Sequence, residues 1–283
     1  MPELPEVENS IRDLKPLLVG RRFEGVDVRW PRLLSGMRAE DFTARLLGRQ
    51  IINADRRGKH LLFALDDGQT LMVHLRMTGQ LRVAPPDEPP TVYDHLIFAL
   101  SDGMELRYQD PRKFGRFLLT TDPQQALAKL GPEPLSESFT PVVLFEKIQG
   151  RRAAIKGLLL NQSVVAGLGN IYADEALFQA GIHPQTPGEA LTLADSSRLH
   201  SAIRQTLATA IREGGSTLGR SGIANYRRPN GVAGHYQERH RVYGRAGKPC
   251  LVCGGPIHRV QVAQRSTHFC PHCQPDGRAI QSD

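Results

Sequence analysis

The four cysteines near the end of this 283-residue chain constrain its fold more than any other feature. They form two pairs, Cys250-x-x-Cys253 and Cys270-x-x-Cys273, with sixteen residues between the pairs. Each pair places two thiolates on one tight turn, and two such turns complete a tetrahedron around Zn²⁺. Because cysteine sulfur fills every position, the spacing predicts one structural zinc ion, since a catalytic zinc would keep a position open.

The segment between the cysteine pairs is expected to be a β-hairpin. Residues 257–262 and 267–269 would form its strands, and Gln264, Arg265 and Ser266 would form its turn. The final region of the chain, residues 241–283, is therefore predicted to be a zinc-binding hairpin.

The charge of the chain indicates a polyanionic partner. Its formal net charge is +7 and its pI is about 9.5, and neutralising nucleic-acid phosphates releases counterions. No apolar run approaches the roughly 20 residues that span a bilayer, and the acidic opening is unlike a signal peptide. We therefore expect a cytoplasmic, nucleoid-associated protein, in which the cysteines bind metal rather than form disulfides. Nothing in the sequence demands more than a monomer.

The first part of the chain has the pattern of one helix followed by many strands. Apolar residues recur at helical spacing over residues 4–18. A short helix is expected at 40–47, and turn dipeptides separate the strand-like runs. These runs are 22–31, 50–56, 60–66, 70–76, 80–83, 93–100, 104–109 and 115–120. The pattern predicts an N-terminal β-sandwich or barrel over residues 1–131, with the first helix packed against it.

The pattern then changes to that of a helical region. Residues 132–140 have the composition of a linker, and a helical domain is expected over 141–240. A glycine-rich, basic loop at 214–234 lies inside it, and such loops are typical of lids and binding segments. The helices are expected at 141–149, 152–160, 171–180 and 192–213. The predicted fold class is therefore a multidomain α+β protein.

The first six residues carry the most distinctive candidate chemistry. We expect Met1 to be removed because the next side chain is small, which leaves the secondary amine of Pro2 at the terminus. Such an amine attacks electrophilic carbons and forms an iminium, as lysine does in Schiff-base enzymes. A helix dipole disfavours the protonated amine, whereas Glu3 and Glu6 favour it and can also move protons. The alternative is that Pro2 is merely tolerated before a helix and the glutamates complement the dipole.

Several loop residues allow two interpretations. Lys59, in the basic turn 55–60, belongs either to a solvated hairpin tip or to a site that stabilises a DNA phosphate or sugar. Met77 and Phe114 are of residue types more typical of a core, although apolar side chains also wedge between DNA base steps. The glycine turn before Asn170 suits a backbone phosphate better than a dinucleotide, because no βαβ alternation surrounds it. A simple helix–helix turn is the alternative there.

These motifs together resemble the bacterial formamidopyrimidine-DNA glycosylases, which are 8-oxoguanine DNA glycosylases of base-excision repair. The resemblance covers nearly the whole chain, and it implies a catalytic β-sandwich, a helix-two-turns-helix domain and a zinc hairpin. It also implies a double-stranded DNA partner with oxidised bases or abasic sites, and neither a membrane nor an obligate protein partner. The segments that carry it are 2–8, 57–59, 74–79, 110–115, 131–135, 162–177 and the four-cysteine region.

The resemblance implies roles for individual residues. Pro2 would attack C1′ of the damaged nucleoside, with Glu3 as acid and base and Glu6 as a supporting carboxylate. Lys59 matches a catalytically important lysine that contacts phosphate. The other matches are DNA contacts: Met77, Arg112 and Phe114 as the trio that fills the void of the flipped nucleotide, His74, Asn170 and Arg265 as phosphate contacts, and Lys156 and Tyr243.

The implied mechanism is base flipping, base displacement by Pro2, and β,δ-elimination at the abasic site. Two departures from the family pattern stand out: Asn161 replaces a usual Asp, and residues 219–225 replace a basic-acidic-aromatic stretch in the loop that folds over the extruded base. One alternative is an endonuclease VIII-like glycosylase for oxidised pyrimidines. Another is a zinc-ribbon DNA-binding protein without activity, which would need neither Pro2 nor Glu3.

Overall fold

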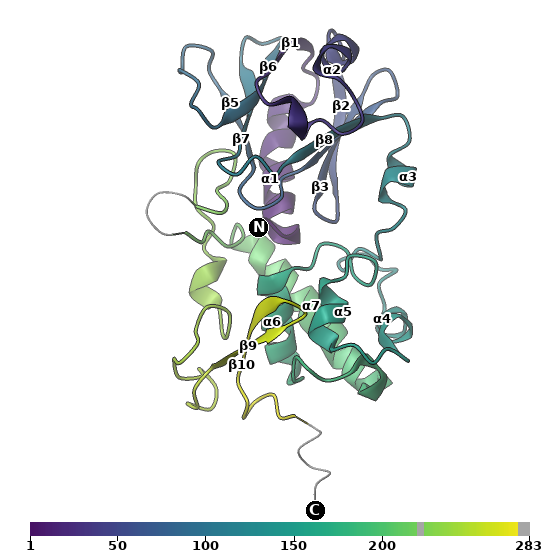
Figure 1. Cartoon of the computed structure of the whole chain (residues 1–283), viewed down its shortest axis with the longest axis vertical. Helices are drawn as coiled ribbons and strands as arrows, with labels where there is room; N and C mark the ends of the chain where they lie inside the picture. Colours follow the sequence, from purple (N-terminus) through teal and green to yellow (C-terminus); the bar gives the residue numbers. More distant parts are fainter. Residues whose placement is uncertain (220–223, 277–283) are drawn as a thin grey trace, which may run out of the picture. The chain divides into compact units, whose positions relative to one another are not determined.

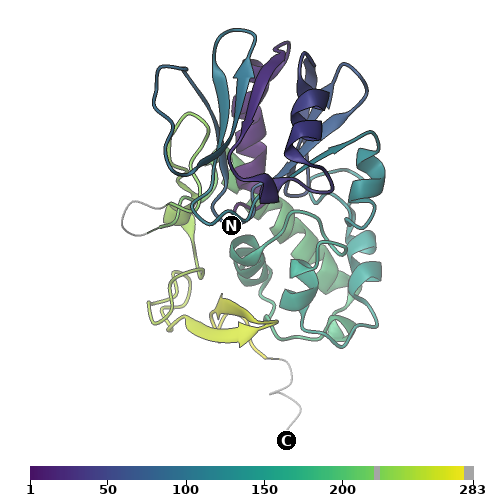
Figure 2. The same cartoon turned by 45° about the horizontal axis from the view of Figure 1, so that its top comes forward.

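The computed structural model describes residues 1–219 and 224–276. The chain divides into two compact units (Figures 1 and 2), the first formed by Met1–Ala128 with Glu213–Gln237 and the second by Lys129–Arg212 with Glu238–Asp283. Among the described residues, no helix has the length and apolar character that crossing a membrane requires.

Helix α1 (Leu4–Leu18) begins the first unit and packs inside it. Its apolar stripe, Val7, Ile11, Leu14 and Leu18, is buried in the same core as residues of both sheets. Figure 1 shows the helix in purple lying between the strands of the two sheets. The first turn of the helix is buried on every side, so its polar groups need partners within the protein.

Within the described residues, the first unit contains two antiparallel four-stranded sheets, in the orders β1-β6-β7-β5 and β2-β3-β4-β8. Their inner faces share an aromatic core, in which Phe98 contacts Phe23 and Phe117 of other strands and Phe42 of helix α2 (Ala39–Leu46). The strands are β1 (Phe23–Val28), β2 (Ile51–Arg57), β3 (His60–Leu65), β4 (Thr70–His74), β5 (Gln80–Ala84), β6 (Asp94–Leu100), β7 (Glu105–Gln109) and β8 (Arg116–Thr120). The predicted β-sandwich with a packed N-terminal helix is confirmed.

The short helices of the first unit show what periodicity can and cannot detect. Helix α2 (Ala39–Leu46) lies where the sequence predicts it. Helix α3 (Pro123–Leu127) is absent from the prediction, although Asp122 and Pro123 signal a helix start. Asp122 accepts a hydrogen bond from the backbone of Gln125. Because the helix spans little more than one turn, it shows no hydrophobic period.

The second unit is built from helices and the zinc hairpin. Its helices are α4 (Pro141–Ile148), α5 (Ile155–Leu160), α6 (Asn170–Ala180) and α7 (Leu193–Arg212), and its strands are β9 (His258–Val262) and β10 (Arg265–Phe269). Helix α6 is buried along nearly its whole length and ends at Gly181, whose φ of 68° gives the left-handed cap that glycine favours. The predicted helical region and hairpin are therefore present.

Two segments lie in different structural surroundings from those expected. Residues 132–140, predicted as a linker, pack on the second unit, where Arg204 donates to the carbonyls of Pro134 and Ser136 and where Phe139 is buried. The segment Glu213–Gln237 groups with the first unit, whereas the sequence predicts the loop 214–234 as part of the helical domain. The chain therefore returns to the N-terminal helix after α7.

The turn of the zinc hairpin differs from the prediction. Val262 pairs with Arg265, so the turn consists of Ala263 and Gln264, and Arg265 begins strand β10. Both turn residues have positive φ, 48° and 59°, as a type I′ hairpin turn requires. The expectation that Arg265 and Ser266 lie in the turn is therefore wrong, because a tighter turn matches the twist of the flanking strands.

The left-handed turn generates a first prediction. Replacing Gln264 by Gly should stabilise the protein by up to about 1 kcal/mol, because glycine removes the steric cost of positive φ. Replacing Gln264 by Val should destabilise it by at least about 1 kcal/mol, since a branched Cβ clashes most in this region. Urea unfolding of the zinc-loaded proteins measures both changes, and equal stability of the two variants would contradict the turn geometry.

Candidate functional site

The N-terminus of α1 brings together the first three residues proposed for chemistry. Pro2, Glu3 and Glu6 are all buried, and the two glutamates form a capping box. The backbone N–H of Glu3 donates to Oε2 of Glu6 at 2.8 Å, and the N–H of Ser216 donates to Oε1 at 2.7 Å. The Glu6 carboxylate therefore holds the helix start and the returning segment of the first unit together.

The surroundings of the terminal amine lower its affinity for a proton. Burial lowers the pKa of the Met1 amine, while Glu3 and Glu6 act to raise it and Lys59 and Arg112 lower it further. The net direction is downward. An amine at this place is therefore more often unprotonated at neutral pH than an exposed terminus, as a nucleophile must be.

Lys59 lies in the two-residue turn between β2 and β3, where Arg57 pairs with His60. Its side chain is only 5% exposed, so the interpretation as a solvated hairpin tip is wrong. Arg56 fastens this hairpin to α1, because its Nε donates to Oε2 of Glu8 at 2.9 Å. Lys59 is thus held among the groups that act electrostatically on the terminal amine.

Two loops present apolar and cationic side chains to solvent. Met77 and Phe114 are 37% and 44% exposed, so the core interpretation favoured by residue type is wrong for both. The guanidinium of Arg112 lies over the ring of Phe114, with 4.6 Å between Cζ and the ring centre. Met77, Arg112 and Phe114 are therefore all exposed, and their role in filling the void of a flipped nucleotide stays a prediction.

A buried carboxylate with no role predicted from the sequence ties these loops together. Asp110 accepts hydrogen bonds from Thr78 Oγ1 at 2.5 Å, from Tyr108 Oη at 3.0 Å, and from the backbone N–H groups of Arg112, Phe114 and Gly115. Burial acts to raise its pKa, but the hydrogen bonds outweigh burial and hold the pKa below its ordinary value. The signal available in the sequence was an Asp directly before Pro-Arg-Lys in a predicted turn.

Glycine is required where both loops approach the Tyr108 hydroxyl. A Cβ at Gly115 would lie 1.8 Å from Tyr108 Oη, and a Cβ at Gly79 would lie 2.3 Å from it. The absence of side chains at these two positions lets Tyr108 reach Asp110. The loop carrying Met77 and the loop carrying Phe114 are thus packed on one hydroxyl and one carboxylate.

His74 is held as a neutral imidazole. Burial is the largest cause that lowers the pKa of His74, and the positive charges of His60, Arg76 and Lys59 lower it further, to about 3. Its Nδ1 accepts a hydrogen bond from the backbone N–H of Arg76 at 3.0 Å. The proton of the neutral ring therefore lies on Nε2, which leaves that atom a donor of the kind that binds phosphate oxygen.

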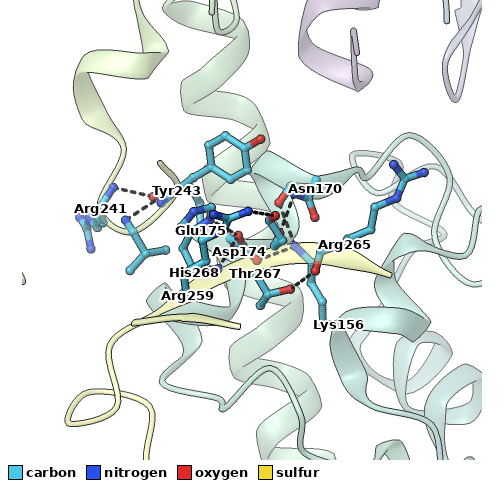
Figure 3. Close-up of polar contacts among 12 residues, drawn as sticks. Lys156, Asn170, Asp174, Glu175, Arg241, Tyr243, Arg259, Arg265, Thr267 and His268 are labelled. Atoms are coloured by element: carbon cyan, nitrogen blue, oxygen red, sulfur yellow. Dashed lines mark hydrogen bonds and ion pairs between the residues drawn. The ribbon is translucent and has the colours of Figure 1, made fainter. Parts of the chain in front are cut away.

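The remaining predicted DNA contacts lie in the second unit (Figure 3). Arg265 is exposed and extends away from the polar cluster, and Tyr243 is partly buried beside His268. Asn170 begins α6 and donates from Nδ2 to the carbonyl of Ser266 at 2.8 Å. The N-terminus of such a helix favours an anion because its first N–H groups point outward.

Lys156 occupies a different environment from the other three. Its side chain is fully buried, and its Nζ donates to the Asn170 carbonyl at 2.9 Å and to Asp174 Oδ1 at 2.5 Å. The structure therefore places Lys156 behind the helix start that carries Asn170. A direct contact of Lys156 with DNA stays a prediction.

The four cysteines converge as their spacing predicts. Their sulfur atoms all lie within 4.8 Å of one another, with 3.8 Å between Cys250 and Cys273 and 3.4 Å between Cys253 and Cys270. Four thiolates around tetrahedral zinc stand about 3.8 Å apart. The donor set therefore fits one structural Zn²⁺, which would hold the hairpin ends without taking part in chemistry.

The departure at Asn161 has a simple structural account. Its Oδ1 accepts hydrogen bonds from Ser163 N at 3.0 Å and from Ser163 Oγ at 2.9 Å. This turn needs one acceptor oxygen, which asparagine supplies as well as aspartate. Of the other departure, residues 220–223 lie outside the described residues.

The Asp110 cluster generates a second prediction. Replacing Asp110 by Asn should lower the free energy of unfolding by at least about 2 kcal/mol, because an amide NH₂ would face donors that now bind an oxygen. Trypsin should also cut faster at Arg112 and Lys113. The exposed Asp87, replaced by Asn in the same unit, is the matched control, and equal protease resistance of the two variants would refute the role of Asp110.

The low pKa of His74 generates a third prediction. The unfolded chain binds a proton at His74 below about pH 6.5, whereas the folded protein binds it only near pH 3, so stability falls as pH falls through this window. His60, whose pKa is also lowered by burial, acts in the same direction. Between pH 7 and pH 5 the free energy of unfolding falls, and replacing His74 by Gln should reduce this fall by up to about 2 kcal/mol. Denaturant unfolding of wild type and His74→Gln at both pH values measures this fall. An equal fall in the two proteins would contradict the buried neutral ring.

Comparison with known proteins follows the same division of the chain. The family profile described as "Formamidopyrimidine-DNA glycosylase N-terminal domain" matches residues 1–117, and "Formamidopyrimidine-DNA glycosylase H2TH domain" matches residues 130–221. The profile described as "Zinc finger found in FPG and IleRS" matches residues 247–275. The last match agrees with the cysteine cluster.

Similar proteins extend over nearly the whole chain. A formamidopyrimidine-DNA glycosylase of Symbiobacterium thermophilum is 49% identical over 97% of this chain and 90% of that protein. A Lactococcus lactis FPG variant in complex with DNA containing Fapy-dG has a TM-score of 0.90 and 38% identity, over 97% of this chain and all of the other. The L. lactis protein with abasic-site DNA has a TM-score of 0.88 and 37% identity over the same shares. The chain therefore belongs to the formamidopyrimidine-DNA glycosylase family.

Proposed function

We propose that this protein excises oxidised purines, such as 8-oxoguanine and formamidopyrimidines, from duplex DNA and then cleaves the strand at the abasic site. The observation that carries the proposal is the buried start of α1, where Glu3, Glu6 and Lys59 surround the terminal amine. Support comes from the similar L. lactis structures, which hold DNA containing Fapy-dG or an abasic site. The comparisons favour no pyrimidine-specific alternative.

The reaction begins by extruding the damaged nucleotide, since a duplex hides the glycosidic bond. Flipping costs roughly a few kcal/mol, because the base loses its stacking and its pairing. The exposed Met77, Arg112 and Phe114 are suited to occupy the space left in the helix, because apolar and guanidinium groups stack on bases. Asp110 holds both loops in place, so little of their binding energy is lost in ordering them.

The amine of Pro2, exposed by removal of Met1, then acts as the nucleophile. It attacks C1′ and gives up its proton to Glu3, the bond from C1′ to the base breaks, and the base leaves with the electron pair and takes a proton from solvent. Glu3 protonates the ring oxygen as the sugar opens, which leaves an iminium between C1′ and the Pro2 nitrogen. Burial lowers the pKa of an amine at this place, as it does for the Met1 amine.

The iminium then draws electrons and acidifies the C2′ proton. Removal of that proton expels the 3′ phosphate by β-elimination, and removal of the C4′ proton then expels the 5′ phosphate by δ-elimination. A one-nucleotide gap remains, and hydrolysis of the iminium frees the amine. Lys59 stabilises the phosphate charge near the reacting sugar, and Glu6 supports the site by fixing the backbone of Glu3.

The segment Glu213–Gln237 is proposed to cap the extruded base. It is anchored to α1 at two places, by the bond from Ser216 to Glu6 and by a bidentate ion pair between Arg228 and Asp13. Residues 219–225 lie between these two anchors in the sequence, and they are the part that departs from the family pattern. We therefore expect the lesion preference to depend on this middle part.

The second unit is proposed to bind the DNA backbone. Asn170 at the start of α6 and Arg265 on the zinc hairpin supply phosphate-binding donors, and Tyr243 lies beside them in the same cluster. The net charge of +7 is consistent with this partner. A chromosomal substrate also supports a cytoplasmic, nucleoid-associated location, and the chemistry requires no protein partner.

Borohydride trapping tests the nucleophile. With duplex DNA containing 8-oxoguanine opposite cytosine, Pro2→Gly should lower covalent trapping and strand cleavage by about two orders of magnitude or more, roughly 3 kcal/mol of barrier. DNA affinity should change little, because the amine makes bonds mainly in the reaction. Pro16→Gly, the same change at an exposed position of α1, is the matched control.

The outcomes separate the alternatives. A Pro2-dependent adduct that favours 8-oxoguanine over thymine glycol supports the proposal, and a preference for thymine glycol would favour an endonuclease VIII-like enzyme. Binding without an adduct would favour a non-catalytic DNA-binding protein. Unchanged cleavage by Pro2→Gly would refute the nucleophile.

A further inference from the structure

The outer edge of strand β10 docks on the side chains of helix α6. Asn170 and Asp174 lie one turn apart on that helix. The side chain of Asn170 donates to the Ser266 carbonyl at 2.8 Å, and Asp174 Oδ2 accepts the backbone N–H of His268 at 2.9 Å. Helix α6 thus offers one donor and one acceptor to a strand edge, as a neighbouring strand would.

Asp174 is the buried centre of this junction (Figure 3). Its side chain is 0% exposed, and its two oxygens face different elements. Oδ1 accepts from Lys156 Nζ of α5 at 2.5 Å, while Oδ2 accepts from the backbone of His268 and lies 3.2 Å from its Nδ1. One carboxylate therefore joins α5, α6 and the zinc hairpin.

The ammonium of Lys156 makes this burial possible. A buried carboxylate is costly unless an opposite charge and hydrogen bonds compensate it. Lys156 also donates to the Asn170 carbonyl at 2.9 Å, so it touches the first residue of α6 as well as Asp174. The position of the helix start and that of the hairpin are thus coupled through one ion pair.

The junction sets the register of the residues that face DNA under the proposed function. Arg265 lies three residues before His268 in β10, and Asn170 lies four residues before Asp174 in α6. A strand edge repeats its outward N–H groups every two residues, so the Asp174 bond selects which residue sits opposite the helix. Sliding by two residues would move Arg265 by about 7 Å.

We propose that Asp174 is a positioning residue that fixes the zinc hairpin on α6 and thereby places Arg265 and Asn170 on the DNA backbone together. The inference rests on the proposed function only in taking DNA as the partner. Asp174 is buried and touches no DNA in this proposal. It acts through the hairpin register, a role distinct from that of the zinc, which closes the cysteine ends of the same hairpin.

Asp174→Asn tests the inference in the full-length, zinc-loaded protein. An amide NH₂ would oppose either the Lys156 ammonium or the His268 N–H, so the hairpin edge loses one anchor. We expect about tenfold weaker binding to an undamaged duplex and to a duplex with a borohydride-reduced abasic site, and a salt slope smaller by about one phosphate contact. The single-turnover excision rate at saturating 8-oxoguanine DNA should stay within about twofold.

A double-mutant cycle separates positioning from general destabilisation. If Asp174 acts through Arg265, adding Asp174→Asn to Arg265→Ala should weaken binding by less than about twofold further. Asp195→Asn, a change at the start of α7 in the same unit, is the matched control and should leave DNA affinity unchanged. Additive losses in the cycle, or unchanged affinity of Asp174→Asn, would overturn the proposal.

A second variant keeps the test decisive if Asp174→Asn loses zinc or unfolds. Replacing Lys156 by Met and Asp174 by Leu together removes the pair without leaving a buried charge, which proteins often tolerate. This variant should retain zinc and show the same tenfold loss of affinity, and wild-type affinity would overturn the proposal. Because the undamaged duplex measures backbone contacts alone, a wild type that binds DNA without trapping would refute the proposed reaction and not this inference.

Discussion

The Glu6 carboxylate is the interaction on which the candidate catalytic site depends. It is buried at the first turn of α1 and accepts backbone N–H groups from Glu3 and from Ser216, which is 210 residues away in the chain. A Cβ at Gly215, whose φ is 83°, would lie 2.8 Å from Glu6 Oε1. Removing the acceptor would leave buried donors unpaired, which costs more than the bond itself contributes.

Two other buried carboxylates also accept hydrogen bonds from separate segments of the chain. Asp110 collects donors from two loops of the first unit, and Asp174 collects donors from α5 and β10 of the second. In each case a buried carboxylate accepts several hydrogen bonds from segments that are distant in sequence. A buried acceptor of this kind orders the exposed residues beside it, so loops that must contact a ligand are set before it arrives.

Most of the secondary structure could be predicted, because the longer elements carry their own period, whereas the five-residue helix α3 is too short to show one. The zinc site was equally readable, since the cysteine spacing alone determines the knuckles. The hairpin turn was placed wrongly, because no glycine or asparagine marks Ala263 and Gln264 as left-handed. The exposure of Met77 and Phe114 was also hidden, since residue type predicts burial only on average.

The sequence by itself determined which of the longer elements form, where zinc binds, and which residues the family resemblance singles out. Only the tertiary structure decided which of them meet: that Lys59 is buried near the terminal amine, that the segment after α7 returns to Glu6, and that Lys156 lies behind Asn170. The physical reason is that periodicity and spacing act over a few residues, whereas the pairing of buried charges depends on contacts between segments far apart in the chain.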